Sequence, residues 1–266
     1  LWNDSIDRMG IGTKYMLSIP FRSNGKIVGY NFRTIDHNLS PKYINSFKPG
    51  EKGKYLFGIT PLSVHKATYK NLTIVEGEID SLHASILGLP NIVAMGGKTA
   101  SIKALKEAKT KGFENVTILL DTEAQKATIQ EEAEAQKERV KQIKGLLDII
   151  KSVGLCGYVA ELPTEERNGA RIKTDVDSFL LTHSINELKE VIDKASSGAK
   201  YLYFQTMAKY EAEESLNDKA IKQLKDEVID LILWAENSPE DTNFIKSTFA
   251  DSLSLSNGGL LLTERD

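Results

Sequence analysis

The fold is decided by residues 72–80, LTIVEGEID, in which a short apolar run ends in two acidic residues around a glycine. A helical pattern follows at 80–87, and the same order of apolar run and helix then occurs twice more. These further pairs are 91–94 with 101–111 and 116–120 with 124–153, before a last apolar run at 157–162. Short apolar runs that alternate with helices are typical of a mostly parallel sheet with right-handed crossovers. We therefore predict an α/β fold.

Acidic side chains follow three of these apolar runs. Glu76 ends the first run, Asp121-Thr122-Glu123 ends the third, and Asp175-Val176-Asp177 follows the fourth after a loop. Because parallel sheets bind ligands beyond the carboxyl ends of their strands, we expect Glu76, Asp121 and Glu123 to converge. Carboxylates without a neutralising partner repel one another, and Mg²⁺, which prefers carboxylate oxygen, relieves that repulsion. The pattern predicts a Mg²⁺ or Mn²⁺ site at this edge of the sheet.

Each acidic residue also has a structural alternative. Asp121 alone fits the N-cap of a following helix, and Glu78 fits a solvated residue at a helix start. Asp175 and Asp177 fit residues that cap a helix or solvate a loop. Three acidic motifs on successive strand ends favour the metal site over these alternatives.

The first seventy residues differ from the rest in charge and pattern. They hold 11 Lys and Arg against 4 Asp and Glu, so this part has a net charge of +7 and the remainder −10. Apolar or alternating runs at 15–20 and 26–34, with a turn at 23–25, predict a β-rich segment. Its positive charge fits a polyanionic partner, and a solvated basic face is the alternative.

Three stretches together resemble a TOPRIM domain, the metal-binding α/β module of bacterial primases, topoisomerases and some nucleases. They are 75–80 (VEGEID), 94–98 (AMGGK) and 119–123 (LLDTE). The resemblance covers about residues 71–195. The EGEID wording is especially similar to phage primase–helicase proteins and their mitochondrial relative Twinkle.

The front of the chain resembles the basic subdomain that precedes TOPRIM in bacterial replicative primases. The stretches that carry this resemblance are 19–22 (IPFR), 25–33 (GKIVGYNFR), 41–46 (PKYINS) and 54–58 (KYLFG). It implies a DNA primase core that synthesises RNA primers on single-stranded DNA by metal-dependent nucleotidyl transfer from ribonucleoside triphosphates. A replicative helicase in cis or in trans and a cytoplasmic location in a bacterium or phage-infected cell are implied too. A TOPRIM nuclease and a decayed single-stranded DNA-binding module are the alternatives.

The resemblance also implies roles for individual residues. Glu76, Asp121 and Glu123 would be catalytic and hold the metal, with Asp80, Asp175 and Asp177 as further ligands or their supports. The residues implied in nucleic-acid or nucleotide binding are Arg22, Arg33, Lys42, Tyr43, Asn45, Lys54 and Lys98.

Two departures from the family pattern stand at this site. The usual Asp-x-Asp is Asp121-Thr122-Glu123, and Ala124-Gln125-Lys126 replaces the Gly-Arg that usually follows. Either the loop has adapted to the longer glutamate, or the second metal position is degraded. Gly96-Gly97-Lys98-Thr99 lacks the spaced upstream glycine of an ATP-hydrolysing phosphate loop, and fits either a phosphate-binding turn or a tight strand-to-helix turn.

After residue 177 the pattern is mainly helical. We predict helices at 185–194 and 218–234, a helix start at 238–241, and a linker at 252–259. Tyr201, Tyr203, Phe204 and Trp234 are predicted core residues. The predicted domains are a basic N-terminal subdomain at 1–70, a TOPRIM domain at 71–195, and a helical segment with linker at 196–266.

Composition excludes several classes of protein. The single Cys156 rules out an intrachain disulfide and an all-cysteine zinc cluster, and the four histidines show no zinc-ligand spacing with it. No apolar run approaches the ~18 residues of a membrane span. The chain begins with Leu and shows no signal peptide, so we expect it to be part of a longer protein.

Overall fold

The computed structural model describes residues 17–36, 38, 40–59, 69–211 and 217–255. The chain divides into two compact units, Leu1–Ala195 and Ser196–Asp266. The first unit holds all of the acidic and basic residues that the sequence analysis assigns to the site.

The first unit opens with a three-stranded antiparallel sheet. Its strands are β1 (Leu17–Ser23), β2 (Lys26–Arg33) and β3 (Tyr43–Asn45), in that order, followed by the short helix η1 (Lys52–Lys54). A two-residue turn joins β1 to β2, as the sequence predicts, although β1 runs three residues past the expected end. Tyr15, where this strand was expected to begin, lies outside the described residues. Phe21 and Phe32 are both buried, and the register places them on opposite faces of this sheet.

A parallel sheet follows, and it confirms the predicted α/β fold. Its strands are β4 (Asn71–Val75), β5 (Ile92–Ala94), β6 (Asn115–Leu120) and β7 (Cys156–Glu161), which lie in the order β7-β6-β4-β5. All three pairings among them are parallel. The crossovers run through α2 (Glu78–Ile86), α3 (Ile102–Thr110) and α4 (Ile129–Ser152). The carboxyl ends of β4 and β6, as neighbouring strands, therefore meet at one edge.

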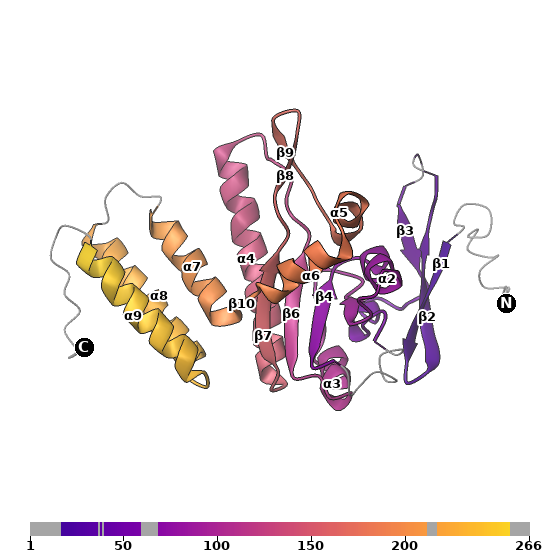
Figure 1. Cartoon of the computed structure of the whole chain (residues 1–266), viewed down its shortest axis with the longest axis horizontal. Coiled ribbons are helices and arrows are strands. Elements are labelled where there is room, and N and C mark those ends of the chain that lie inside the picture. The colour runs from indigo at the N-terminus through magenta and orange to yellow at the C-terminus, as the bar shows by residue number, and fades with distance from the viewer. Residues whose placement is uncertain (1–16, 37, 39, 60–68, 212–216, 256–266) are drawn as a thin grey trace. The chain divides into compact units, whose positions relative to one another are not determined.

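Helices cover both faces of this sheet, as Figure 1 shows. On one face, α2, α5 (Val176–Thr182) and α6 (Ile185–Asp193) enclose a core of apolar side chains. Val75 and Leu119 from the strands pack there with Phe179 and Leu188. On the other face lie α3 and α4. Because successive strand residues point to opposite faces, the apolar runs of β4 and β6 serve both cores.

Three local features differ from the sequence predictions. The helix expected from 124 begins at Ile129, because the Thr128 side chain accepts the N–H of Glu131 and caps it there. The helix α5 was not predicted, since its seven residues are too few to show a period. A hairpin of β8 (Glu165–Arg167) and β9 (Ala170–Ile172) was also missed.

The second unit contains β10 (Ser196–Ser197), α7 (Gly198–Glu211), α8 (Asp218–Trp234) and α9 (Pro239–Leu255). The helix α8 has the predicted bounds, and α9 starts at Pro239 after Ser238, as expected. The linker predicted from 252 is wrong as far as Leu255, because α9 continues to there, and 256–259 lie outside the described residues. Tyr201 and Tyr203 are core residues, but Phe204 is 51% exposed.

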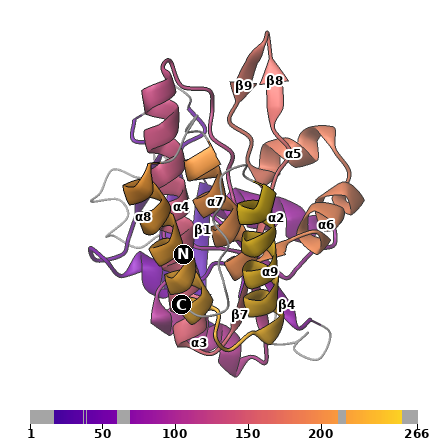
Figure 2. The ribbon, with the colours of Figure 1, turned by 90° about the vertical axis from the view of Figure 1, so that its left-hand side faces the viewer.

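Figure 2 shows the ribbon from the side. Among the helices in the described ranges, none combines the length and the apolar character needed to cross a membrane.

Replacement by alanine should change the free energy of unfolding in opposite directions at Gly145 on α4 and at Gly157 on the neighbouring strand β7. A Cβ on Gly157 would lie 2.6 Å from Leu147 Cδ2, whereas a Cβ on Gly145 meets nothing within 4 Å. We expect Gly157→Ala to lower the free energy of unfolding by about 1–3 kcal/mol through overpacking. Gly145→Ala should raise it by up to about 1 kcal/mol through helix propensity. Urea unfolding of both variants measures this, and equal effects would contradict the packing described.

Candidate active site

Two acidic residues follow neighbouring strands directly. Glu76 follows β4 and Asp121 follows β6, and the parallel register pairs Ile74 with Ile118 just before them. Both side chains line one cavity of about 390 Å³. The convergence of these two residues therefore arises from strand order and register alone.

The electrostatics of this edge reflect an excess of negative charge. Partial burial raises the pKa of Glu76, and the nearby charge of Asp121 raises it further. Partial burial also raises the pKa of Asp121, while a hydrogen bond from Lys173 lowers it. Lys173 Nζ lies 2.9 Å from Asp121 Oδ2. The Lys173 ammonium group thus provides a positive charge beside Asp121, where the carboxylates of this edge would also stabilise a bound cation.

Glu123, the third expected ligand, points to a neighbouring cavity. Its carboxylate pairs with Lys126 Nζ at 3.1 Å and is about half exposed. That cavity, of about 570 Å³, is lined by Glu123 together with Glu76 and Lys173. Glu123 therefore borders the acidic edge without joining Glu76 and Asp121 in one cluster.

The donor set fits a divalent cation in its chemistry, although not in its present arrangement. Within the described residues, no three His, Cys, Asp or Glu side chains are gathered closely enough to hold a metal ion; His37 and His65 lie outside those residues. Carboxylate oxygens are the ligands that Mg²⁺ prefers. The Lys173 ammonium group pairs with the Asp121 carboxylate, where such a cation would otherwise bind. An ion would bind here by taking the place of that ammonium group.

Asp80 ties two helices together. Its Oδ2 accepts the N–H of Gly77, and its Oδ1 accepts the N–H of Asp177 at 2.8 Å, which joins the start of α2 to the first turn of α5. Gly77 is required here because a Cβ would collide with the Asp80 carboxylate. Burial raises the pKa of Asp80 to about 7, although the Asp177 N–H lowers it. Asp80 therefore stabilises the fold by joining the start of α2 to α5.

The two remaining acidic residues also have structural partners. Asp175 caps α5 by accepting the N–H of Ser178 at 2.8 Å, which is the capping alternative weighed above. Asp177 Oδ1 lies 2.8 Å from His83 Nδ1. Both aspartates nevertheless line the cavity that contains Glu76 and Asp121.

The residues expected to bind nucleic acid or nucleotide fall into two groups. Arg33, Lys42, Tyr43 and Lys98 line the cavity with Glu76 and Asp121. The other three expected residues, Arg22, Asn45 and Lys54, do not line it. They serve local contacts instead: Arg22 donates to the Gly25 carbonyl, Asn45 accepts the Phe47 N–H, and Lys54 pairs with Glu51.

Glu78 is buried at the start of α2. It is 4% exposed, which contradicts the alternative of a solvated residue at a helix start. Lys52 Nζ lies 2.8 Å from its Oε1, and Asn31 Nδ2 donates to the same oxygen at 3.1 Å. Both partners come from the N-terminal segment. This buried ion pair therefore holds the basic segment against the start of α2.

Main-chain hydrogen bonds join the start of the Gly96-Gly97-Lys98 turn to the end of β4 and to Glu76, the residue after it. The Gly96 N–H donates to the Glu76 carbonyl at 3.2 Å, and the Met95 N–H donates to the Val75 carbonyl at 2.9 Å. Both alternatives for this turn, a phosphate-binding turn and a tight strand-to-helix turn, stay predictions. Lys98 then contributes its side chain to the cavity.

The sequence is similar to bacterial DNA primases, although no family model matches the chain. It is 24% identical over 232 residues to the DNA primase of Synechococcus elongatus, and 29% over 204 residues to that of Aquifex aeolicus. These matches cover 86% and 76% of this chain but 30% and 35% of the relatives. The chain therefore spans about a third of the length of the curated relatives it matches.

Solved primase cores share the fold. The DnaG primase catalytic domain bound to ssDNA has a TM-score of 0.63 at 18% identity, covering 89% of this chain and 68% of that one. The E. coli primase catalytic core has a TM-score of 0.62 at 18% identity, covering 91% and 71%. The Aquifex aeolicus primase, with zinc-binding and RNA polymerase domains, has 0.60 at 21% identity, covering 90% and 51%.

The fold is an α/β core with acidic residues at the ends of two neighbouring parallel strands. More particularly, the chain has the fold of the DnaG primase catalytic core and is similar in sequence to bacterial DNA primases. The resemblance to the TOPRIM primase core is thereby confirmed, and the resemblance to phage primase–helicases and Twinkle stays a prediction.

The raised pKa of Asp80 predicts a specific pH dependence of stability. An aspartate in the unfolded chain titrates near ~4, while Asp80 in the fold titrates at about 7. The folded state holds this proton more tightly, so wild-type stability falls as pH rises between these values. Asp80→Asn removes the titration. The free energy of unfolding of the variant relative to wild type should therefore rise by about 1.4 kcal/mol per pH unit between pH ~5 and ~7.

Urea denaturation at several pH values measures this difference. A gap between variant and wild type that stays constant with pH would contradict the raised pKa, whatever its absolute size. Asn also weakens one of the two backbone contacts, and that loss shifts the whole curve without changing its slope.

Proposed function

We propose that this chain is the catalytic core of a DNA primase, which synthesises short RNA primers on single-stranded DNA. One observation carries the proposal: a single cavity joins the acidic strand ends, Glu76 and Asp121, to Arg33 and Lys42 of the basic N-terminal segment. An acidic edge suits divalent metal, and an opposite basic wall suits phosphates. A polymerase of nucleotides needs both.

The relatives and solved neighbours support this proposal. The relatives that the chain matches over most of its own length are named DNA primases, and one solved catalytic domain of the same fold is bound to single-stranded DNA. We extend that template to this chain. A replicative helicase, in cis or in trans, and a cytoplasmic site of action in a bacterium or phage-infected cell belong to the same proposal.

The reaction would join a 3′-hydroxyl to the α-phosphate of an incoming ribonucleoside triphosphate, with pyrophosphate as the leaving group. Glu76 and Asp121, with Glu123, would hold Mg²⁺ or Mn²⁺, which when bound neutralises phosphate charge and activates the attacking oxygen. Arg33 would contact template or nucleotide phosphate as a bidentate donor, while Lys42 and Lys98 would act as point charges. Lys173, once released from Asp121, becomes a further cation for these phosphates.

A second candidate follows from the ion pair between Lys173 and Asp121. If that pair persists, the acidic edge is neutralised without metal, and the chain would be a single-stranded DNA-binding module whose catalytic site has decayed. A nuclease that uses the same metals is the third possibility from the family resemblance. One set of assays separates the three.

We predict that Glu76→Gln abolishes primer synthesis, by at least about a hundredfold, because it removes an anionic metal ligand. Incorporation of labelled ribonucleotides on single-stranded DNA by the intact protein, with Mg²⁺ or Mn²⁺, measures the activity. The melting temperature and the affinity for DNA should stay at wild-type values. Full activity in this variant would overturn the metal assignment.

In the same experiment, the products of the wild-type protein distinguish the candidate functions. Nicking of the template without primers would identify a nuclease. Binding of single-stranded DNA with neither reaction would identify the decayed module.

We expect Arg33→Ala and Lys42→Ala each to weaken binding to single-stranded DNA and to lower its salt dependence. Each lost phosphate contact reduces the slope of log K against log salt by about 0.7 on a single strand. Fluorescence anisotropy across a salt series measures that slope. Lys189→Ala, an exposed position on α6 outside the cavity, is the matched control. Slopes that remain at the wild-type value in both variants would assign these residues to solubility alone.

A further inference from the structure

The loop after β6 is held by groups that lie outside it. Thr122, the middle residue of the Asp121-Thr122-Glu123 motif, forms three hydrogen bonds with Thr174. Its N–H and its hydroxyl donate to the Thr174 carbonyl at 2.8 and 3.3 Å, and its Oγ1 accepts the Thr174 N–H at 2.7 Å. These bonds join the motif to the segment that precedes α5.

The carbonyl groups of the two acidic residues are each bound by an arginine. Arg139 of α4 donates to the Asp121 carbonyl. Arg171 of β9 donates through Nε to the Glu123 carbonyl at 3.0 Å. Arg171 lies 48 residues further along the chain than Glu123, so no local sequence pattern around the motif predicts this contact.

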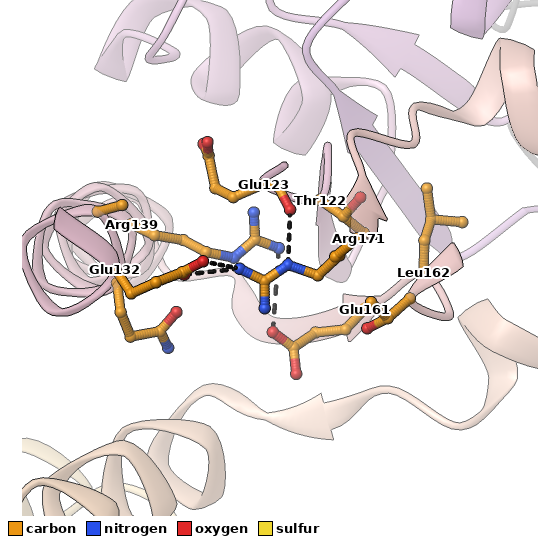
Figure 3. A pocket seen from close by; sticks show the side chains of 10 residues that line it. Thr122, Glu123, Glu132, Arg139, Glu161, Leu162 and Arg171 are labelled. Carbon is orange, nitrogen blue, oxygen red and sulfur yellow. Dashed lines mark hydrogen bonds and ion pairs between the residues drawn. The ribbon is translucent and has the colours of Figure 1, made fainter. Parts of the chain in front are cut away.

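Arg171 is itself fixed at its other end. Its Nη2 lies 2.7 Å and 2.6 Å from the two carboxylate oxygens of Glu132, in the first turn of α4. Figure 3 shows the Arg171 guanidinium between Glu132 and the Glu123 main chain, with Arg139 beside it. The Arg171 main chain also exchanges hydrogen bonds with Gln125, at 2.9 and 3.2 Å. The residue therefore binds the loop and α4 at once.

This arrangement needs an arginine rather than any cation. The guanidinium is planar and presents several N–H donors in fixed directions, so one group can bind a carbonyl and a carboxylate together. A lysine ammonium at the same place would reach one partner or the other.

The Glu123 carboxylate has little else to fix it. Its side chain is about half exposed, and within the described residues it pairs only with the nearby Lys126. Glutamate also has one more rotatable bond than the aspartate usual at this position, so its carboxylate depends more on where its backbone is held.

We infer that Arg171 is a positioning residue, which holds the Glu123 main chain so that its carboxylate faces the cavity shared with Glu76. This inference rests on the proposed function for its consequence, because Glu123 matters there as a metal ligand. The competing explanation is a purely structural role, in which Arg171 only joins the β8–β9 hairpin to α4. The two differ in whether the Arg171–Glu132 ion pair alone is sufficient.

The test compares Arg171→Ala, Arg171→Lys and the charge-swapped double variant E132R/R171E in the intact protein. Manganese affinity is measured by electron paramagnetic resonance of free Mn²⁺, and amide hydrogen exchange is followed over residues 121–126. The matched control is Arg167→Ala, an exposed arginine near the tip of the same hairpin. We expect Arg171→Ala to weaken Mn²⁺ binding about tenfold, as loss of a group that orients a ligand does. Exchange in the loop should also accelerate.

The other variants separate positioning from simple support. Arg171→Lys should fall between wild type and Arg171→Ala, and Arg167→Ala should match wild type. The charge swap should restore the melting temperature but not the Mn²⁺ affinity, because it rebuilds the ion pair without the bond to the Glu123 carbonyl. Exchange over residues 121–126 is compared in the single variants, because Glu132 also accepts the Lys126 N–H at 2.7 Å and the swap removes that bond. A swap that restores both the melting temperature and the Mn²⁺ affinity would overturn the inference in favour of a purely structural role.

Failure of the inference about Arg171 can be distinguished from failure of the proposed function. Unchanged exchange in Arg171→Ala would overturn the inference, even with primer synthesis intact in the wild type. If the wild type neither binds Mn²⁺ nor makes primers, the proposed function fails, and loop exchange alone decides whether Arg171 holds Glu123.

Discussion

The structure of the site depends on the crowding of carboxylates at one edge of a parallel sheet. Strand order places Glu76 and Asp121 on neighbouring strand ends, where partial burial raises both pKa values. The charge of Asp121 raises the pKa of Glu76 further, and the charge of Asp175 raises that of Asp121. The surroundings compensate with cations: Lys173 binds the Asp121 carboxylate, and Arg139 binds its carbonyl. An edge that needs so much positive charge is poised to accept metal ions.

The second requirement is a basic wall facing that edge, and one buried ion pair provides it. Lys52 and Asn31 of the N-terminal segment bind Glu78 at the start of α2, two residues after Glu76. Breaking a buried pair is costly, because it leaves an uncompensated charge. Arg33 and Lys42 are thereby kept in the same cavity as the acidic residues. The ion pair of Glu78 therefore lies two residues from Glu76, the proposed metal ligand.

Much of this architecture could be predicted from the sequence, because the signals are local. Apolar runs that alternate with helical patterns predicted the parallel sheet, and Ser238 before Pro239 predicted the start of α9. The helix α5 escaped because seven residues show no period. The burial of Glu78 and the clamp of Arg171 on Glu123 escaped for another reason. Their partners are separated by 47 and 48 residues, and only the folded chain brings them together.

The central claim is that the Glu76–Asp121 edge is a metal site in which Lys173 substitutes for the ion. The most direct measurement is anomalous diffraction at the manganese edge from crystals of the protein grown with Mn²⁺. The account predicts an anomalous peak in contact with Glu76 and Asp121, with the Lys173 ammonium displaced from Asp121. Crystals that contain Mn²⁺ yet show no peak there, with Lys173 still paired to Asp121, would contradict it.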